Sequence, residues 1–370
     1  MDDTDPSDAL LALVLAGGPG APRRALLERH PSAAAALHAG VAGGSTAGLD
    51  ATTRARLRRP CGERLARCRD WLAQPGRHLL GWRDPDYPPL LRAIASPPLA
   101  LFVDGDPAWL WHPAVAVVGS RNPSVGGGDN ARVFATALAA CGLVVASGMA
   151  AGIDACAHQA ALDAGAATIA VVGTGPDLAY PTRHAPLRAR IATHGAVVSE
   201  HPPGTGARAA HFPARNRLLA GLALGTLVVE AAHRSGALIT ARLAAEAGRE
   251  VMALPGSIHN PLARGCHRLI RDGALLVESP QEVVEALAPA AQALGRQLRL
   301  RLGEQAPAAA APDPENQAGR VWRALGHEPA DLDQLAARTG LDVAALAPAL
   351  LQLELDGRIA REHGRYQRRS

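Results

Sequence analysis

Short apolar runs rich in valine recur between residues 113 and 287, and a helical pattern separates each run from the next. The runs cover residues 114–118, 143–146, 168–172, 196–198, 226–229, 250–253 and 275–277. Polar residues do not alternate within them, as expected for strands of a parallel sheet that is covered on both faces. Strands that alternate with helices predict a doubly wound α/β fold with an extended Rossmann-like parallel sheet.

The ends of the first four runs carry small or polar residues. They are Gly119, Ser120 and Arg121, then Ser147 and Gly148, then Gly173 and Gly175, and finally Ser199 and Glu200. Ligands of open α/β sheets bind beyond the carboxyl ends of the strands, so these loops line the expected site. Glycine and serine let an anion approach backbone N–H groups, and an arginine adds charge. The second run lacks the acid that holds a ribose hydroxyl, which argues against a dinucleotide dehydrogenase.

Residues 212–241 add further polar groups to the same edge. Arg215, Asn216 and Arg217 stand at the start of an apolar helical run, where backbone N–H groups lack partners and anions bind well. A polar turn then precedes the next helix near residue 237, and it contains His233, Arg234, Ser235 and Gly236. Arginines beside this edge predict an anionic ligand, and we favour a phosphate backbone.

Three ionisable residues near this edge have competing interpretations. Glu230 ends the fifth strand and suits the base of a hydrolase. It suits equally a group that orients Arg215 or Arg217 through a salt bridge, which we favour because no second carboxylate or metal ligand accompanies it. Asp154 suits a helix N-cap at least as well as a ligand contact. His158 is expected to pack in the interior.

The sequence contains no lysine, so all 38 of its basic residues other than histidine are arginine. A Walker-type phosphate lysine, a Schiff-base lysine and a lysine general base are therefore excluded. The formal net charge of +4 permits a nucleic-acid partner without requiring one. The five cysteines form no CxxC pair. We expect neither a disulfide framework nor a metal site, and no cofactor.

The first residues contain an apolar run, but four aspartates precede it, where a signal peptide carries positive charge. No stretch approaches the roughly 20 apolar residues that span a bilayer. We therefore expect a cytoplasmic protein that does not enter a membrane.

Four segments of different composition are expected along the chain. Residues 1–74 predict a small helical domain, and the α/β domain covers residues 75–287, beginning with an irregular extension over residues 76–111. Residues 288–315 are rich in Ala, Pro and Gln, which predicts a linker. Residues 316–370 show three helical stretches and a final hairpin pattern, typical of a winged helix.

Basic residues cluster in two places outside the α/β domain. Residues 54–69 carry seven arginines against one acid, Glu63, and we favour a solvated helix face over a DNA contact. Residues 317–370 carry eight arginines and seven acids, and the third helix there, residues 343–355, has one acid and no base. This balance is poor for a helix that reads DNA, so we expect a protein contact or a duplex contact through the wing.

Six motifs in order, GSRNPS, SGMAAGID, GTGPDLAYP, FPARNRLLAGL, VVEAAHRSGALITARLAAEAGREVMALPG and GCHRLIRDGA, resemble the DprA/Smf family. The resemblance covers about residues 87–284. It implies a SAM-like helical first domain and a terminal winged helix around the α/β domain. It also implies a non-enzymatic protein of natural transformation that binds single-stranded DNA, protects it, helps to load the RecA recombinase and forms homodimers through the α/β domain.

The resemblance assigns individual roles at the expected site. It places Arg121 at the DNA pocket, Phe212 as a base-stacking ring and Arg215 as a phosphate contact. A stacked aromatic contributes about 1–3 kcal/mol per base. The chain departs from the family pattern at His184 and His267, where asparagine is usual, and at Gly126, Gly127 and Gly128, which replace the common Tyr-Gly.

Two alternatives remain open from the sequence. The first is a nucleotide-cleaving hydrolase related to phosphoribohydrolases, which use a similar glycine-rich sheet. Their PGGxGTxxE loop is absent here, because Glu230 is followed by AAHRSGALITA. The second is a transcription-factor-like regulator that acts through residues 317–370, which the lack of basic residues in the third helix disfavours.

Overall fold

The computed structural model describes residues 6–42, 48–301, 317–326, 329–355, 358–362 and 365–368. The chain divides into two compact units, Met1–Gly295 and Arg296–Ser370, which are described separately. No helix among the described residues is both long enough and apolar enough to cross a membrane.

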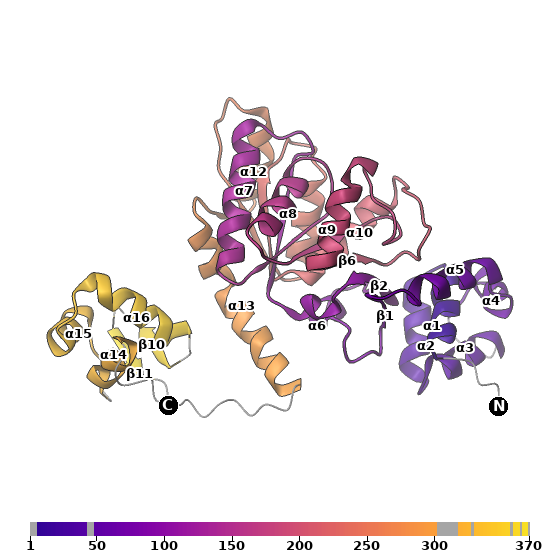
Figure 1. Cartoon of the computed structure of the whole chain (residues 1–370), viewed down its shortest axis with the longest axis horizontal. Coiled ribbons are helices and arrows are strands. Elements are labelled where there is room, and N and C mark those ends of the chain that lie inside the picture. The colour runs from indigo at the N-terminus through magenta and orange to yellow at the C-terminus, as the bar shows by residue number, and fades with distance from the viewer. Residues whose placement is uncertain are drawn as a thin grey trace. The chain divides into compact units, whose positions relative to one another are not determined.

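A nine-stranded sheet forms the centre of the first unit, in the order β1-β2-β6-β5-β4-β3-β7-β8-β9. Figure 1 labels β1, β2 and β6 at one edge of this sheet. The strands are β1 (Arg77–Gly81), β2 (Ala100–Gly105), β3 (Ala114–Gly119), β4 (Val144–Ser147), β5 (Thr168–Val171), β6 (Ala196–Ser199), β7 (Gly225–Glu230), β8 (Glu250–Ala253) and β9 (Leu275–Leu276). The chain moves outward from β3 through β4, β5 and β6, then returns to pair β7 with the other side of β3. The strand order therefore reverses between β3 and β7, where open sheets bind ligands.

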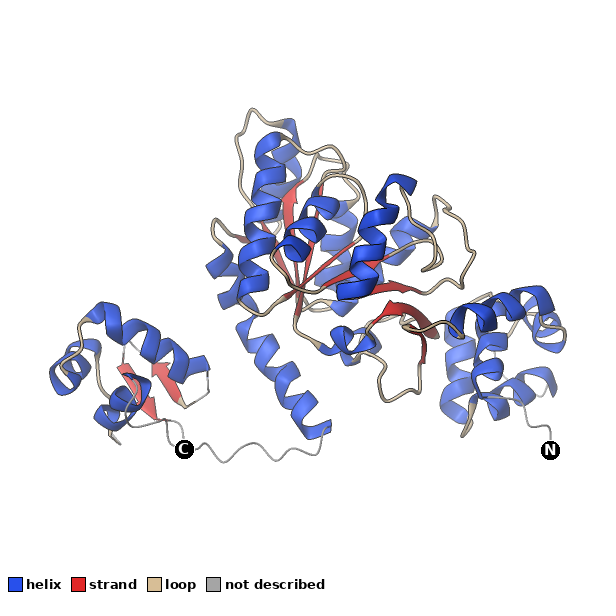
Figure 2. Ribbon diagram, viewed as in Figure 1, coloured by secondary structure: helices blue, strands red, loops and turns tan. Residues whose placement is uncertain are grey.

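Helices cover both faces of the sheet (Figure 2). On one face lie α6 (Pro89–Arg92), α10 (His211–Leu222), α11 (Ala237–Glu246) and α12 (Arg264–Arg271). On the other lie α7 (Val125–Ala140), α8 (Ile153–Asp163), α9 (Ala185–His194) and the first turns of α13 (Pro280–Arg301). Successive residues of β3 point to opposite cores, because Val115 and Val117 join one cluster while Ala116 and Val118 join the other. The doubly wound α/β prediction is confirmed.

The extension over residues 76–111 was expected to be irregular, and this expectation is wrong. β1 pairs antiparallel with β2, and β2 pairs antiparallel with β6, so the sheet is mixed at this edge. The two strands are separated by residues 82–99, which hold α6 and five prolines. Short 3-10 turns complete the unit at Pro107–Trp111, Thr182–His184 and Pro261–Ala263.

Residues 6–42 and 48–74 form helices joined by short turns, as predicted. Their helices are α1 (Pro6–Leu15), α2 (Gly20–Arg29), α3 (Ala33–Ala42), α4 (Ala51–Arg58) and α5 (Gly62–Leu72). They pack on the antiparallel edge of the sheet, where the rings of Trp71 and Phe102 meet edge-on at 6.1 Å. The contact places α5 beside the sheet rather than on a separate body (Figure 1).

The second unit has the predicted order of a winged helix. It contains α14 (Gln317–Leu325), α15 (Leu332–Thr339), α16 (Val343–Leu355), β10 (Ile359–Glu362) and β11 (Arg365–Arg368). Asp331 caps α15 in a capping box with Gln334, and Gly340 ends that helix with φ +68°. The expected linker over residues 288–315 is wrong in its first half, because α13 continues to Arg301. Its remainder, residues 302–315, lies outside the described residues.

Candidate functional site

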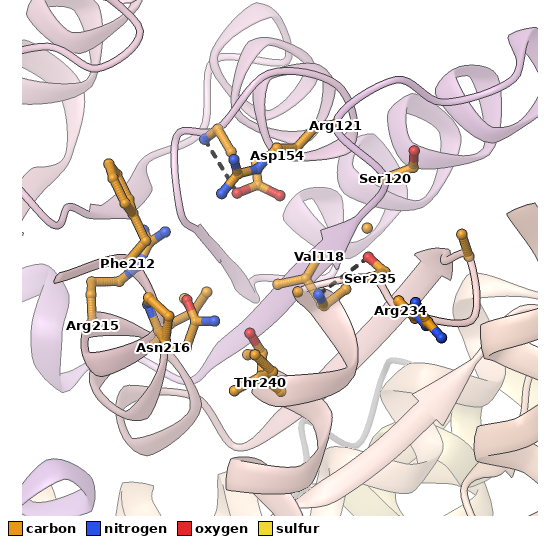
Figure 3. Close-up of a pocket in the computed structure, with 18 of the residues that line it drawn as sticks. Val118, Ser120, Arg121, Asp154, Phe212, Arg215, Asn216, Arg234, Ser235 and Thr240 are labelled. Atoms are coloured by element: carbon orange, nitrogen blue, oxygen red, sulfur yellow. Dashed lines mark hydrogen bonds between the residues drawn. The ribbon is translucent and has the colours of Figure 1, made fainter. Parts of the chain in front are cut away.

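A cavity of about 870 Å³ opens at the carboxyl ends of β3 and β7, where the strand order reverses. Its walls come from the β3–α7 loop, the N-terminal half of α10 and the turn that leads into α11. Figure 3 shows Phe212 and Asn216 on one side of it and Arg234 and Ser235 on the other. The cavity therefore forms at the strand ends that the sequence singles out. Nine of the predicted site residues line it: Gly119, Ser120, Arg121, Phe212, Arg215, Asn216, Arg234, Ser235 and Gly236.

The loops at this edge are held together by backbone contacts that require glycine. Ser120 donates its N–H to the Glu230 carbonyl at 2.7 Å, and its own carbonyl accepts from Ile153 N at 3.1 Å. Gly152, directly before Ile153, has φ +83°, and a Cβ on Gly152 would collide with the Ser120 carbonyl. A Cβ at Gly119 would lie 2.6 Å from the Ile153 side chain. Larger residues at either glycine would push the first and second loops apart.

The rim of the cavity carries an exposed arginine beside a pair of aromatic rings. The guanidinium of Arg121 lies 6.0 Å from the centre of the Phe212 ring. Phe212 in turn meets Tyr180 at 5.1 Å, and Tyr180 is 48% exposed. Within the described part of the chain, Arg121 makes no hydrogen bond or ion pair. A cation beside an exposed tyrosine and a half-buried phenylalanine can hold a phosphate and a base together.

The opposite wall is the turn before α11. Arg234 is exposed there, and within the described ranges its guanidinium has no ion pair or hydrogen bond. Ser235 directs its hydroxyl oxygen at the Ala237 N–H, 3.3 Å away, and Gly236 has open space around its Cα. The turn thus presents a free positive charge and accessible backbone to the cavity.

Arg215 differs from Arg121 because it is buried. It is 5% exposed, and its guanidinium donates to the carbonyls of Gly148, at 2.8 Å, and Val171. Burial lowers its pKa to about 10, while the nearby carboxylate of Asp154 opposes that shift. Arg215 therefore ties together the ends of β4 and β5, whatever it also offers to a ligand.

Arg217 does not line the cavity. Its two terminal nitrogens bind the two carboxylate oxygens of Glu200, at 3.0 and 2.5 Å. The expectation that these arginines begin a helix is also wrong, because α10 starts at His211 and places Arg215 in its second turn. Their backbone N–H groups are therefore not the free donors of a helix start.

Four other predicted site residues support the walls from behind. Ser147 is fully buried and donates to the Val117 carbonyl at 2.6 Å. A Cβ on Gly148 would collide with Arg215, one on Gly173 would lie 3.3 Å from the Phe212 ring, and one on Gly175 would lie 2.8 Å from the Pro202 carbonyl. These positions shape the site without lining it.

Glu230 does not orient an arginine, so the expected salt bridge to Arg215 or Arg217 is wrong. Its buried carboxylate accepts from the Ser124 N–H at 2.8 Å, the Ser124 hydroxyl at 2.6 Å and the Asn260 amide at 3.0 Å. Ser124 is the N-cap of α7, so the acid lies at the positive end of that helix. Glu230 does not line the cavity, and its hydrogen bonds fix three loops instead of presenting a base.

Asp154 is not the helix cap, because α8 has Gly152 at its N-cap position. Its carboxylate accepts from the N–H groups of Gly148 and Ala150, and burial raises its pKa. His158 is packed in the interior as predicted, and burial lowers its pKa to about 3.

The two histidines that depart from the family pattern both donate to backbone carbonyls. His184 lies 3.0 Å from the Met149 carbonyl, and His267 lies 2.9 Å from that of Gly256. Because a carbonyl only accepts, the ring nitrogen carries the proton in each case. Each histidine therefore fixes a loop near this edge of the sheet.

Tyr180 also lines the cavity, although it is not among the predicted site residues. It belongs to the quoted GTGPDLAYP motif, and the sequence has only three tyrosines. An aromatic residue beyond the end of a strand on the ligand-binding edge was the available signal. The loop before α10 also lines the cavity through Ala207 and Ala209, which carry no chemical signal in the sequence.

Comparison with known proteins identifies the family. A family model of DNA recombination-mediator protein A matches residues 78–288, and one of the DprA winged helix domain matches residues 305–365. The chain belongs to this family.

Relatives of the DprA/Smf family resemble the chain in sequence and in structure. Protein Smf of Escherichia coli K12 is 43% identical over 304 residues, which cover 80% of this chain and 79% of that protein. The X-ray structure of DprA from Streptococcus pneumoniae has a TM-score of 0.68 at 38% identity, covering 74% of this chain and 95% of that one. A structure of Helicobacter pylori DprA, which addresses its single-stranded DNA binding mode, has a TM-score of 0.51 at 29% identity, covering 55% and 94%.

Proposed function

We propose that this DprA-family protein binds single-stranded DNA in the cavity at the ends of β3 and β7. The observation that carries the proposal is the rim, where Arg121 stands 6.0 Å from Phe212 and Phe212 meets Tyr180. A strand would lay its phosphates against Arg121 and Arg234 and stack a base on the aromatic pair. The single-stranded DNA binding mode described for the H. pylori relative supports the same ligand here.

The proposed binding tolerates any sequence. Arginine contacts to phosphates carry no base information, and every base has a face that stacks on an aromatic ring. The protein would thereby cover incoming single strands of any sequence, protect them and help to load RecA recombinase during natural transformation. Membership of a recombination-mediator family supports this role. A homodimer formed through the α/β domain belongs to the same proposal.

Titration with a labelled oligo-dT and with a duplex of equal length, at two salt concentrations, tests the proposal. We expect the single strand to bind more tightly, and Arg121→Ala to weaken binding and flatten its salt dependence. Arg217→Gln is the matched control, because it removes an arginine that Glu200 engages outside the cavity. Equal affinity of the Arg121→Ala variant and the unmodified protein would contradict the proposal.

The finer parts of the proposal need separate measurements. Light scattering on the purified protein measures whether it is a dimer. Filament assembly by RecA on strands covered with a competing single-strand binder measures loading, and we expect this protein to accelerate it. The Arg121→Ala variant should lose that acceleration together with its affinity for the strand.

A further inference from the structure

The arginine-rich helices of the first 74 residues lie next to the loop that leads into the cavity. Arg67 on α5 packs over Gly204, where a Cβ would come within 2.6 Å of its Nη1 atom. Gly204 begins the stretch that continues through Ala207 and Ala209, both of which line the cavity. Three residues span at most about 11 Å, so Arg67 stands a short distance beyond the cavity wall.

Two further arginines lie along this path. Arg208 is exposed on the loop itself, near His201, whose pKa is lowered chiefly by burial and only slightly by the Arg208 charge. Arg64 is exposed on α5. Burial raises the pKa of the Cys68 thiol, and the charges of Arg64 and Arg67 both oppose that rise, so the two arginines lie near the same side chain. Within the part of the chain that the structure describes, neither Arg64 nor Arg208 makes a hydrogen bond or ion pair through its side chain.

The carboxylates in this region do not neutralise the path. Glu63 pairs with Arg67 at 3.2 Å, but both side chains are more than half exposed. Such a pair contributes only a few tenths of a kcal/mol, so a phosphate can replace it. Asp177 accepts the Gly204 N–H at 2.9 and 3.0 Å and keeps its negative charge, but the three arginines outnumber Glu63 and Asp177.

We propose that Arg64, Arg67 and Arg208 form a second contact surface that carries the strand from the cavity onto α5. The inference rests on the proposed binding of single-stranded DNA and extends it to the helical domain. At the spacing of a duplex strand, consecutive phosphates lie about 3.4 Å apart along the axis. About three nucleotides at this spacing span the roughly 11 Å between the cavity wall and Gly204, over which Arg67 packs. Only longer strands reach this second contact surface, because all nucleotides of a short strand lie in the cavity.

The test compares two lengths of oligo-dT, about 6 and about 16 nucleotides, within the range of known single-strand sites. The double variant Arg64→Gln/Arg67→Gln should bind the short strand like the unmodified protein. For the long strand, loss of two phosphate contacts makes the slope of log affinity against log salt shallower by about 1.4. Between 50 and 200 mM salt, the unmodified protein should thus lose about seven-fold more affinity than the variant.

The control is Arg132→Gln/Arg190→Gln, which removes two exposed, acid-paired arginines that do not line the cavity. It should match the unmodified protein on both strands. If the melting temperature of the α5 variant changes, Arg208→Gln on the loop replaces it in the comparison. An unchanged slope for the long strand, with Arg121→Ala still impaired, overturns this inference and leaves the cavity proposal intact. Failure of the unmodified protein to bind either strand overturns both.

Discussion

Replacing Arg215 should destabilise the fold, even though the residue lines the proposed DNA site. Its guanidinium is 5% exposed and donates to the carbonyls of Gly148 and Val171, which end two neighbouring strands. Alanine at this position removes both donors. It also removes the positive charge that holds down the pKa of the buried Asp154 carboxyl.

The size of the effect follows from these contacts. Hydrogen bonds that involve a charged group contribute about 1.5–3 kcal/mol each, so Arg215→Ala should cost about 3–6 kcal/mol. For a unit as large as Met1–Gly295, 1 kcal/mol corresponds to about 1.6 °C of melting temperature. The expected loss is about 5–10 °C.

Thermal unfolding followed by circular dichroism measures this loss, with Arg121→Ala as the matched control. Arg121 is exposed, so its removal should shift the melting temperature by less than about 1 °C. Asp154→Asn in the Arg215→Ala background should cost less than the sum of the single changes, because no buried charge is then left without its neighbour. A melting temperature of Arg215→Ala equal to that of the unmodified protein would refute the reasoning.

Three further predictions concern other residues of the unit. Glu230→Gln places an amide where three donors converge, so it should lower the melting temperature by about 2–5 °C. The unmodified protein should release no free base from nucleoside monophosphates. If it does release base and Glu230→Gln abolishes that release, the hydrolase alternative is favoured. Phe212→Ala should weaken binding of oligo-dT by about 1–3 kcal/mol without a matching change for duplex, and equal loss on both would argue against base stacking. Burial lowers the pKa of His158 to about 3, so its ring takes up a proton only in the unfolded chain as pH falls below about 6.5. The free energy of unfolding should therefore drop by on the order of 1–2 kcal/mol between pH 6.5 and 5. His158→Gln should flatten this pH dependence in chemical denaturation.

The sequence predicted the parallel part of the sheet closely, because each of its strands is a short apolar run next to a helix. Only the strand ends moved by a residue, as in β7, which spans Gly225–Glu230. The antiparallel strands β1 and β2 were missed for a physical reason. Their pairing partners are each other and β6, so the contacts that make them strands are distant in sequence. The proline-rich segment between them gave no periodic signal.

The sequence predicted where the candidate site lies, but not which of its residues line the cavity and which only support the fold. The strand-end pattern located the cavity, since the topology of a doubly wound sheet dictates where it opens. It could not distinguish Ser147, which holds two strands together, from Ser120, which faces the cavity. Both end a strand in a Ser-Gly or Gly-Ser pair, and only the packing of the loops separates them.

Arginine is the residue type for which this distinction matters most, because the chain has no lysine and must use arginine for every cationic task. Arg215 is committed to backbone carbonyls, Arg217 to a carboxylate, and Arg121 to neither. A guanidinium offers five donors in a fixed plane, so it can join strand ends as readily as it grips a phosphate. The partners that each guanidinium finds decide which task it performs: the buried Arg215 gives terminal donors to the fold, whereas Arg121, exposed and unpaired within the described residues, keeps its donors for a ligand. A loss of DNA binding in an arginine variant is therefore informative about contact only when its melting temperature is unchanged.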